Sequence, residues 1–191
     1  MKLTKIAAKI LLITVIGISG GQLLFGCASM NNMGKPETLA TPRIAPVSPA
    51  TATAEQKRFL DAQPASLSRL NVVRTFVVNP KLAEAWGPFG VYVLRTSTLP
   101  PRDREILILR IGWLNQSQYE FTQHVRVAKG VGMSDAEIER IKAGADAGGW
   151  TAFEAALVKA VDQLRASSFI DDKVWGVLKS RYDDKQLMDV V

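Results

Sequence analysis

The chain has 191 residues, of which 47% are hydrophobic and 22% are charged. This length is enough for one domain of ordinary size with a buried core, plus extra segments. The single cysteine cannot form an internal disulfide, which excludes a cystine-stabilised scaffold. The formal charge is +6, but no basic stripe with interleaved aromatic residues is present, so nucleic acid is not an expected partner.

The first 27 residues have the order of a bacterial export signal. Lysines at positions 2, 5 and 9 precede an apolar run, and small residues follow it. The segment ends in Leu24-Phe25-Gly26-Cys27, which is similar to a lipobox, where a cysteine is lipidated and becomes the new N-terminus. We expect an exported, periplasmic or membrane-anchored lipoprotein with Cys27 as its lipidation site. A cleaved signal without lipid and an uncleaved anchor are the alternatives.

Removing this segment also changes the charge balance. Without the three lysines the formal charge falls from +6 to +3, since 6 − 3 = 3. Residues 28–54 follow as a predicted disordered tether, because prolines lie there among Ala, Thr and Ser with few large apolar residues. Such a tether would let a domain stand off from a membrane.

From Glu55 to Val191 the hydrophobic periodicity is helical, and no window alternates as a strand does. We therefore predict an all-α domain over residues 55–191. Short helices are expected at 55–62 and up to Phe76. Asn79 and Pro80 then start a helix with a broad apolar face, in which Gly87-Pro88 is a predicted kink.

The next two helices are predicted from about Arg102 to Leu114 and from Ser117 to Val131. The first is apolar nearly all round, which predicts burial on most sides. Gly112 would permit a close approach of another helix. A polar break at 115–117 separates the two, so a hairpin is possible.

Capping signals place the remaining helices. Helix starts are expected at the pairs Ser134 and Glu137, Thr151 and Glu154, and at Asp171 or Asp172 and Asp183. The last helix is apolar and the chain stops within its pattern, which suggests a truncated C-terminus.

Four polar residues stand out in the predicted hairpin. Ser117, Glu120 and His124 are spaced i, i+3, i+7 and therefore share one helix face. If the two helices pack together, Glu105 of the first helix can meet His124. A carboxylate beside an imidazole orients the ring for general acid–base chemistry. The alternative is a core histidine that one carboxylate satisfies, since buried polar groups find partners whatever their role.

Other site types are less well supported by these residues. His124 is the only histidine, and zinc usually has at least three protein ligands, so we expect no metal. Ser117 lies two turns from His124 and lacks a nucleophile elbow, which disfavours a serine hydrolase.

The segment LPPRDREILILRIGWLNQSQYEFTQHVRVAKGVGMSDAEIERI resembles the carboxymuconolactone decarboxylase family, whose redox branch is the AhpD-like alkylhydroperoxidases. The resemblance extends from about Lys57 to the C-terminus and includes GWTAFEAALVKAVDQL and FIDDKVWGVLKSRYDDKQLMDVV. It implies an AhpD-like helical bundle built round a central helical hairpin, and assembly as a homo-oligomer.

The AhpD-like pattern is a Glu followed by Cys-x-x-Cys-x-x-x-His. Matched on His124, the acid falls at Glu105 and the cysteines fall at Ser117 and Glu120. Both cysteines are therefore absent. Thiol peroxidase chemistry requires a thiolate, so the resemblance argues against that activity here.

The decarboxylase branch does without the cysteine pair and without a cofactor. Resemblance to it implies acid–base chemistry of the lyase or isomerase type on a small carboxylated or lactone-like metabolite. His124 would be the base or acid, Glu105 its orienting partner and Glu120 a second acid or base. Candidate substrate-binding residues are Arg110, Arg126, Trp113, Tyr119 and Ser117, with Arg126 better suited to a surface charge.

Two other functions stay open at this point. One is a non-catalytic small-molecule-binding or structural lipoprotein that keeps the polar row for packing. The other is a degenerate alkylhydroperoxidase relative that has lost its thiols. We expect no cofactor in any of these cases, and a membrane contact through the N-terminal lipid or anchor.

Overall fold

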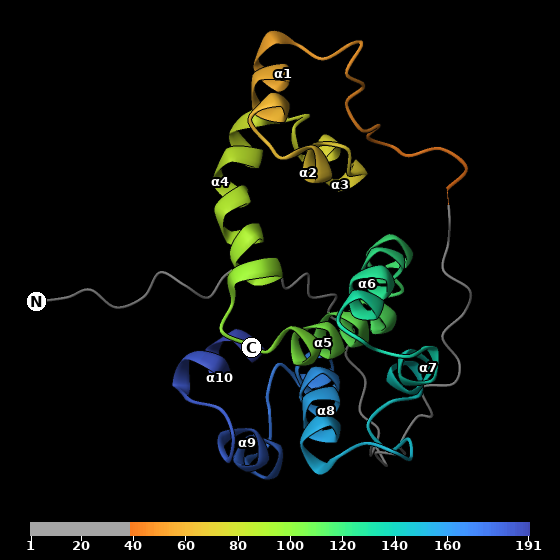
Figure 1. The fold of residues 1–191 in the computed structure, drawn as a ribbon, viewed down its shortest axis with the longest axis vertical. Coiled ribbons are helices and arrows are strands. Elements are labelled where there is room, and N and C mark those ends of the chain that lie inside the picture. Colours follow the sequence, from red (N-terminus) through yellow and green to blue (C-terminus); the bar gives the residue numbers. More distant parts are fainter. Residues whose placement is uncertain (1–38) are drawn as a thin grey trace, which may run out of the picture. The chain divides into compact units, whose positions relative to one another are not determined.

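The computed structural model describes residues 39–191 (Figure 1). The predicted export signal, Cys27 and residues 28–38 of the predicted tether lie outside this range. Over residues 39–191 the chain forms helices and no strand, which confirms the all-α prediction. None of the helices in this range is long and apolar enough to cross a membrane.

The first group of helices follows a helix-free stretch at 39–53, in which the Val47 N–H donates to the Arg74 carbonyl at 3.0 Å. It consists of α1 (Ala54–Asp61), α2 (Ala65–Ser68), α3 (Asn71–Phe76) and α4 (Pro80–Val91). The segment predicted up to Phe76 is thus two short helices. Asn79 caps α4 and Pro80 opens it, as predicted.

The regular α-helix does not end at Gly87-Pro88, where a kink was predicted. Helix α4 continues through Pro88 to Val91, and a π-helical turn, η2 (Tyr92–Thr96), follows it directly. The apolar face of α4 also stays outside the main core. Leu82 is 49% exposed and Phe89 is 61% exposed, while Ala83 and Gly90 are buried.

The second group of helices forms the main core. Its members are α5 (Pro101–Leu114), α6 (Gln118–Gly130), α7 (Asp135–Ala143), α8 (Ala152–Ser167), α9 (Asp172–Lys179) and α10 (Asp184–Val190). Helix α5 packs against α6, α7 and α8, and α9 packs against α8 (Figure 1). The helical hairpin of α5 and α6 is therefore central, as the resemblance implied.

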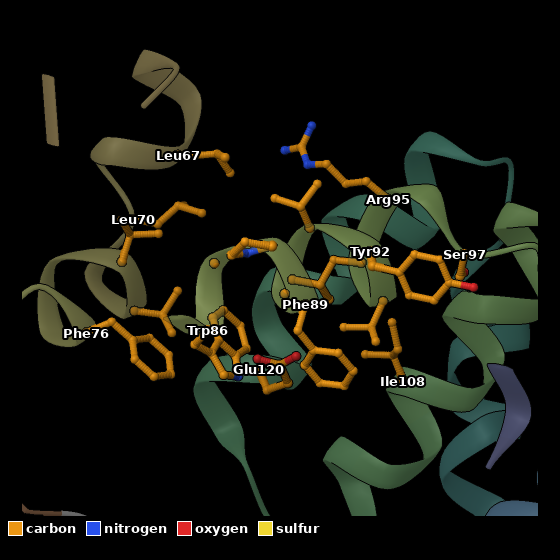
Figure 2. A pocket seen from close by; sticks show the side chains of 18 of the residues that line it. Leu67, Leu70, Phe76, Trp86, Phe89, Tyr92, Arg95, Ser97, Ile108 and Glu120 are labelled. Atoms are coloured by element: carbon orange, nitrogen blue, oxygen red, sulfur yellow. The ribbon is translucent and has the colours of Figure 1, made fainter. Parts of the chain in front are cut away.

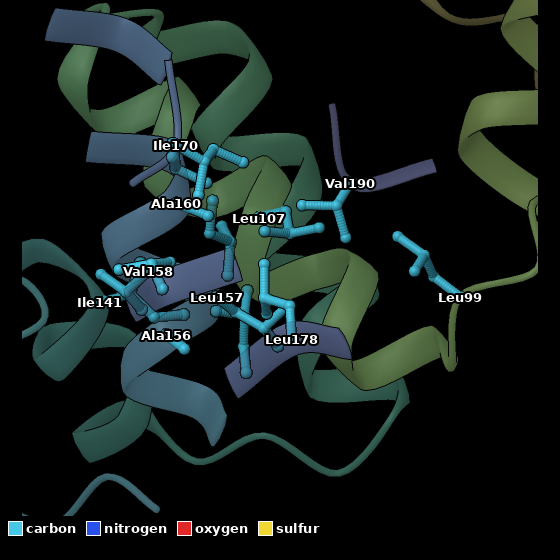
Figure 3. Close-up of a cluster of buried hydrophobic side chains, with 14 of the residues drawn as sticks. Leu99, Leu107, Ile141, Ala156, Leu157, Val158, Ala160, Ile170, Leu178 and Val190 are labelled. Atoms are coloured by element: carbon cyan, nitrogen blue, oxygen red, sulfur yellow. The ribbon is translucent and has the colours of Figure 1, made fainter. Parts of the chain in front are cut away.

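Helix α5 is buried on most sides, as its composition predicted. Ile106 and Leu109 are fully buried, and residues from α8, α9 and α10 complete the cluster (Figure 3). Burying a side chain of this size stabilises a fold by about 1.5–3 kcal/mol. Gly112 faces α6, but an added Cβ would lie 3.7 Å from the Phe121 nitrogen, an ordinary contact. Close helix approach therefore does not depend on this glycine.

The predicted capping residues are all in place. Ser134 with Glu137 and Thr151 with Glu154 form reciprocal capping boxes, and Asp171 and Asp183 cap α9 and α10. Helix α10 contributes Leu187 and Val190 to the core. These caps fix where each helix around α5 begins.

Candidate active site

The candidate site lies on the facing sides of α5 and α6. The turn between these helices passes through Gln116, whose φ of 54° is left-handed. The Asn115 side chain accepts a hydrogen bond of 2.7 Å from Arg165 Nε of α8. This tight turn folds α6 back along α5 and brings their polar residues face to face.

Glu105 and His124 meet, as the predicted hairpin required. His124 Nδ1 lies 2.7 Å from Glu105 Oε2, and the Glu105 side chain is completely buried. One turn earlier on α6, Glu120 Oε1 lies 3.2 Å from His124 Nε2. The imidazole is thus held between two carboxylates, one buried and one 40% exposed.

The two carboxylates control the charge of the ring. Burial alone would lower the pKa of His124, but hydrogen bonds to Glu105 and Glu120 outweigh it and raise the pKa to about 9. The bond with His124 lowers the pKa of Glu120, against the effect of its partial burial. At neutral pH the ring is therefore an imidazolium, with an N–H directed at each carboxylate.

His124 and Glu120 line a large, mostly apolar cleft of 2070 Å³. Aromatic side chains of α4 form part of its wall, and Figure 2 shows Trp86 and Phe89 in the same part of the cleft as Glu120. Trp86 is stacked on Phe76, with ring centroids 4.5 Å apart. Small apolar molecules with a few polar groups suit a space of this composition.

One predicted substrate-binding residue reaches the cleft. Tyr119 lines it, and the tyrosine hydroxyl accepts a hydrogen bond of 3.4 Å from the Val72 N–H. Ser117 does not line the cleft and caps the start of α6 with its backbone. Trp113 packs against Phe121 instead, with ring centroids 5.7 Å apart.

Arg110 is not a substrate clamp in this structure. Its guanidinium donates to Asp162 of α8 at 2.6 Å and to the carbonyls of Ile141 and Lys142 at 2.9 Å. The side chain is buried and tied to α7 and α8, away from the cleft. An arginine can serve a helix terminus as well as a ligand, and Arg110 here bonds the carbonyls at the end of α7. Arg126 is exposed on α6, as expected of a surface charge.

A different arginine, not predicted from the sequence, lies at the cleft. Arg104 of α5 lines the cleft, and its side chain is only 11% exposed. Its Nε lies 3.8 Å from Glu105 Oε1. Adjacency to Glu105 was the available signal, but neighbouring helix residues usually point in different directions.

The described residues contain no cluster of three or more side chains suited to holding a metal ion. The site consists of a carboxylate–imidazolium–carboxylate row beside an apolar cleft. Such a row can move protons.

Comparison with known proteins concerns the family and the fold. The sequence model of the carboxymuconolactone decarboxylase family matches residues 80–163, which span α4 to most of α8. Over these residues the chain resembles the carboxymuconolactone decarboxylase family. The match includes Glu105, Glu120 and His124.

A solved structure shares the fold. The crystal structure of an uncharacterized peroxidase-related protein from Silicibacter sp. TM1040 superposes with a TM-score of 0.64 at 18% sequence identity, covering 83% of this chain and 84% of that one. No curated protein sequence matches the chain. The structural likeness supports the AhpD-like helical fold and says nothing further about chemistry.

Proposed function

We propose that this protein belongs to the carboxymuconolactone decarboxylase family and catalyses cofactor-free acid–base chemistry, of the lyase or isomerase type, on a small carboxylated or lactone-like metabolite. One observation carries the proposal: the His124 ring is held between Glu105 and Glu120 at the wall of an apolar cleft. A ring placed in this way is a general acid at neutral pH.

The proposed proton donor is His124 Nε2. In a decarboxylation, the bond to the leaving carboxylate breaks, its electron pair moves into a conjugated carbonyl, and carbon dioxide departs. The resulting enolate carbon then takes the proton from Nε2. Glu105 keeps the ring oriented through Nδ1. Glu120 is the more exposed carboxylate and can pass a proton from solvent back to the ring.

The same geometry sets a condition on catalysis. Both ring nitrogens already have carboxylate partners, so a substrate reaches Nε2 only if Glu120 moves aside. At 3.2 Å the contact with Glu120 is longer than the 2.7 Å contact with Glu105, and the Glu120 side chain is 40% exposed. We therefore assign Glu120 as the residue that swings away when substrate binds.

This observation also favours a second candidate function. A ring with both nitrogens occupied by its own protein is what a non-catalytic binding or structural protein would keep for stability. A panel of small lactones and carboxylic acids, tested with purified protein, separates the two. The enzyme proposal expects turnover that His124→Gln abolishes. The non-catalytic alternative expects binding without turnover.

We also propose export and assembly. Export rests on the order of residues 1–27, with Cys27 as the lipidation site. Assembly as a homo-oligomer is supported by the exposed apolar face of α4, where Leu82, Trp86 and Phe89 are each more than one-third exposed. A membrane contact through the N-terminus and a small-molecule ligand are the remaining partners in this proposal.

A further inference from the structure

Arg104 is a largely buried cation whose Nε has no hydrogen-bond partner. A guanidinium has five N–H donors, yet within residues 39–191 the Arg104 guanidinium donates no hydrogen bond that meets ordinary geometry, and its buried Nε has no partner. Its nearest anionic atom is Glu105 Oε1 at 3.8 Å, which is too long for a hydrogen bond. Leaving buried charged donors unpaired is costly, so such a group calls for an explanation.

Two other arginines of the same helix have close hydrogen-bond partners. Arg102 pairs with Glu137 and Glu154. Arg110 pairs with Asp162 and two backbone carbonyls. Unlike Arg110, Arg104 lines the cleft. Its ion-pair contact is the 3.8 Å approach to Glu105 Oε1, a buried oxygen that has no hydrogen-bond partner of its own.

The position of Arg104 relates it to the proton donor. Glu105 Oε2 receives the His124 ring, and Glu105 Oε1 faces Arg104. The imidazolium and the guanidinium thus flank one buried carboxylate, and both line the same cleft. The buried hydroxyl of Ser97 also has no hydrogen-bond partner, and Ser97 lines the same cleft.

We propose that Arg104 is the specificity-determining residue of the cleft and binds a carboxylate of the substrate. This inference rests on the proposed function, because it names what the same site recognises. A guanidinium forms two parallel hydrogen bonds with a carboxylate, which orients the ligand as well as attracting it. The aromatic wall at Trp86 and Phe89 would accept the apolar body of the ligand.

The group that Arg104 binds is a carboxylate that the reaction leaves intact. A carboxylate that departs as carbon dioxide loses its negative charge as the bond breaks. A cation paired with it would therefore stabilise the bound substrate more than the transition state and slow the reaction. An anchor for a retained carboxylate holds the substrate equally in the ground and transition states. Loss of Arg104 should then raise KM more than it lowers kcat.

The test uses benzoate and benzamide as matched probes, which differ in charge but hardly in shape. Because His124 is the only histidine, its ring resonances in protein without a histidine tag report binding near the site. Arg104→Gln should weaken benzoate binding by about tenfold or more and change benzamide binding by less than about twofold. Arg126→Gln removes the same charge from the exposed face of α6 and should change neither.

Several results would overturn the inference. The first is that the wild type binds benzoate and benzamide equally well. The second is that benzoate binding does not saturate. The third is that Arg104→Gln leaves the affinity for benzoate unchanged. If that variant unfolds, Arg104→Lys serves instead, because lysine keeps the positive charge but lacks the planar pair of N–H donors. The affinity for benzoate should still fall several-fold. An unchanged affinity in Arg104→Lys would then refute bidentate anchoring.

The binding test is independent of turnover. If benzoate binding depends on Arg104 but no substrate is turned over, the anchor stands and the enzymatic proposal fails. If turnover is found and Arg104→Gln leaves KM unchanged, the enzymatic proposal stands and the anchor is refuted.

Discussion

The charge of the His124 ring can be measured directly. Because the chain has one histidine, a protein without a histidine tag gives a single set of imidazole resonances. We expect these to titrate with a pKa of about 9, raised from 6.5 by the two carboxylates despite burial. Glu105→Gln replaces the buried carboxylate with a neutral amide of the same shape, while burial still disfavours the imidazolium. The ring pKa should then fall by more than about one unit.

The same shift predicts how stability depends on pH. A rise from 6.5 to about 9 corresponds to about 3 kcal/mol of stabilisation. Because the pKa is raised on folding, this contribution is complete below pH 6.5 and is lost as the pH rises through about 9. Glu120 acts in the opposite direction. Because folding lowers the pKa of Glu120, this carboxylate stabilises the folded state at pH values above its ordinary pKa. That stabilisation is lost as the pH falls through the lowered pKa.

Urea unfolding at several pH values checks this prediction. The free energy of unfolding of the wild type should fall between pH 6.5 and pH 9.5 by more than that of Glu105→Gln. Arg126→Gln, altered on the exposed face of the same helix, should follow the wild type. A wild-type ring that titrates near 6.5, or a ring pKa that Glu105→Gln does not change, would refute the assignment of the raised pKa to this carboxylate.

Two further predictions concern chemistry and assembly. Purified protein should show no thiol-dependent peroxide reduction, because residues 28–191 contain no cysteine; peroxidase activity that persists after alkylation would show this reasoning to be mistaken. Light scattering should report a homo-oligomer, and Leu82→Glu on the exposed face of α4, outside the cleft lining, should weaken it; a strictly monomeric wild type would contradict the assembly proposal.

The hairpin was predictable because its signals are local and strong. Helix periodicity gives α5 and α6, and the spacing of Glu120 and His124 puts both on one face. The contact between Glu105 and His124 then follows once the two helices pack together. Capping pairs such as Ser134 and Glu137 fixed helix starts for the same reason, since their bonds span three residues.

The roles of the arginines depended on tertiary contacts. Arg110 and Arg104 are both arginines of one helix, and periodicity does not tell which of them meets α7 and α8 and which meets the cleft. Helix α4 shows the same limit. Its broad apolar face is evident from the sequence, but Trp86 and Phe89 of that helix line a cleft that only the three-dimensional arrangement defines.

The central claim is that His124 delivers a proton to a substrate. It is tested most directly by kcat/KM against pH for whichever lactone or carboxylic acid the wild type turns over, compared with His124→Gln. We expect activity at neutral pH that declines as the pH rises through about 9, when the imidazolium loses its proton. His124→Gln should lower kcat/KM by about a hundredfold or more. Undiminished turnover in His124→Gln would contradict the claim.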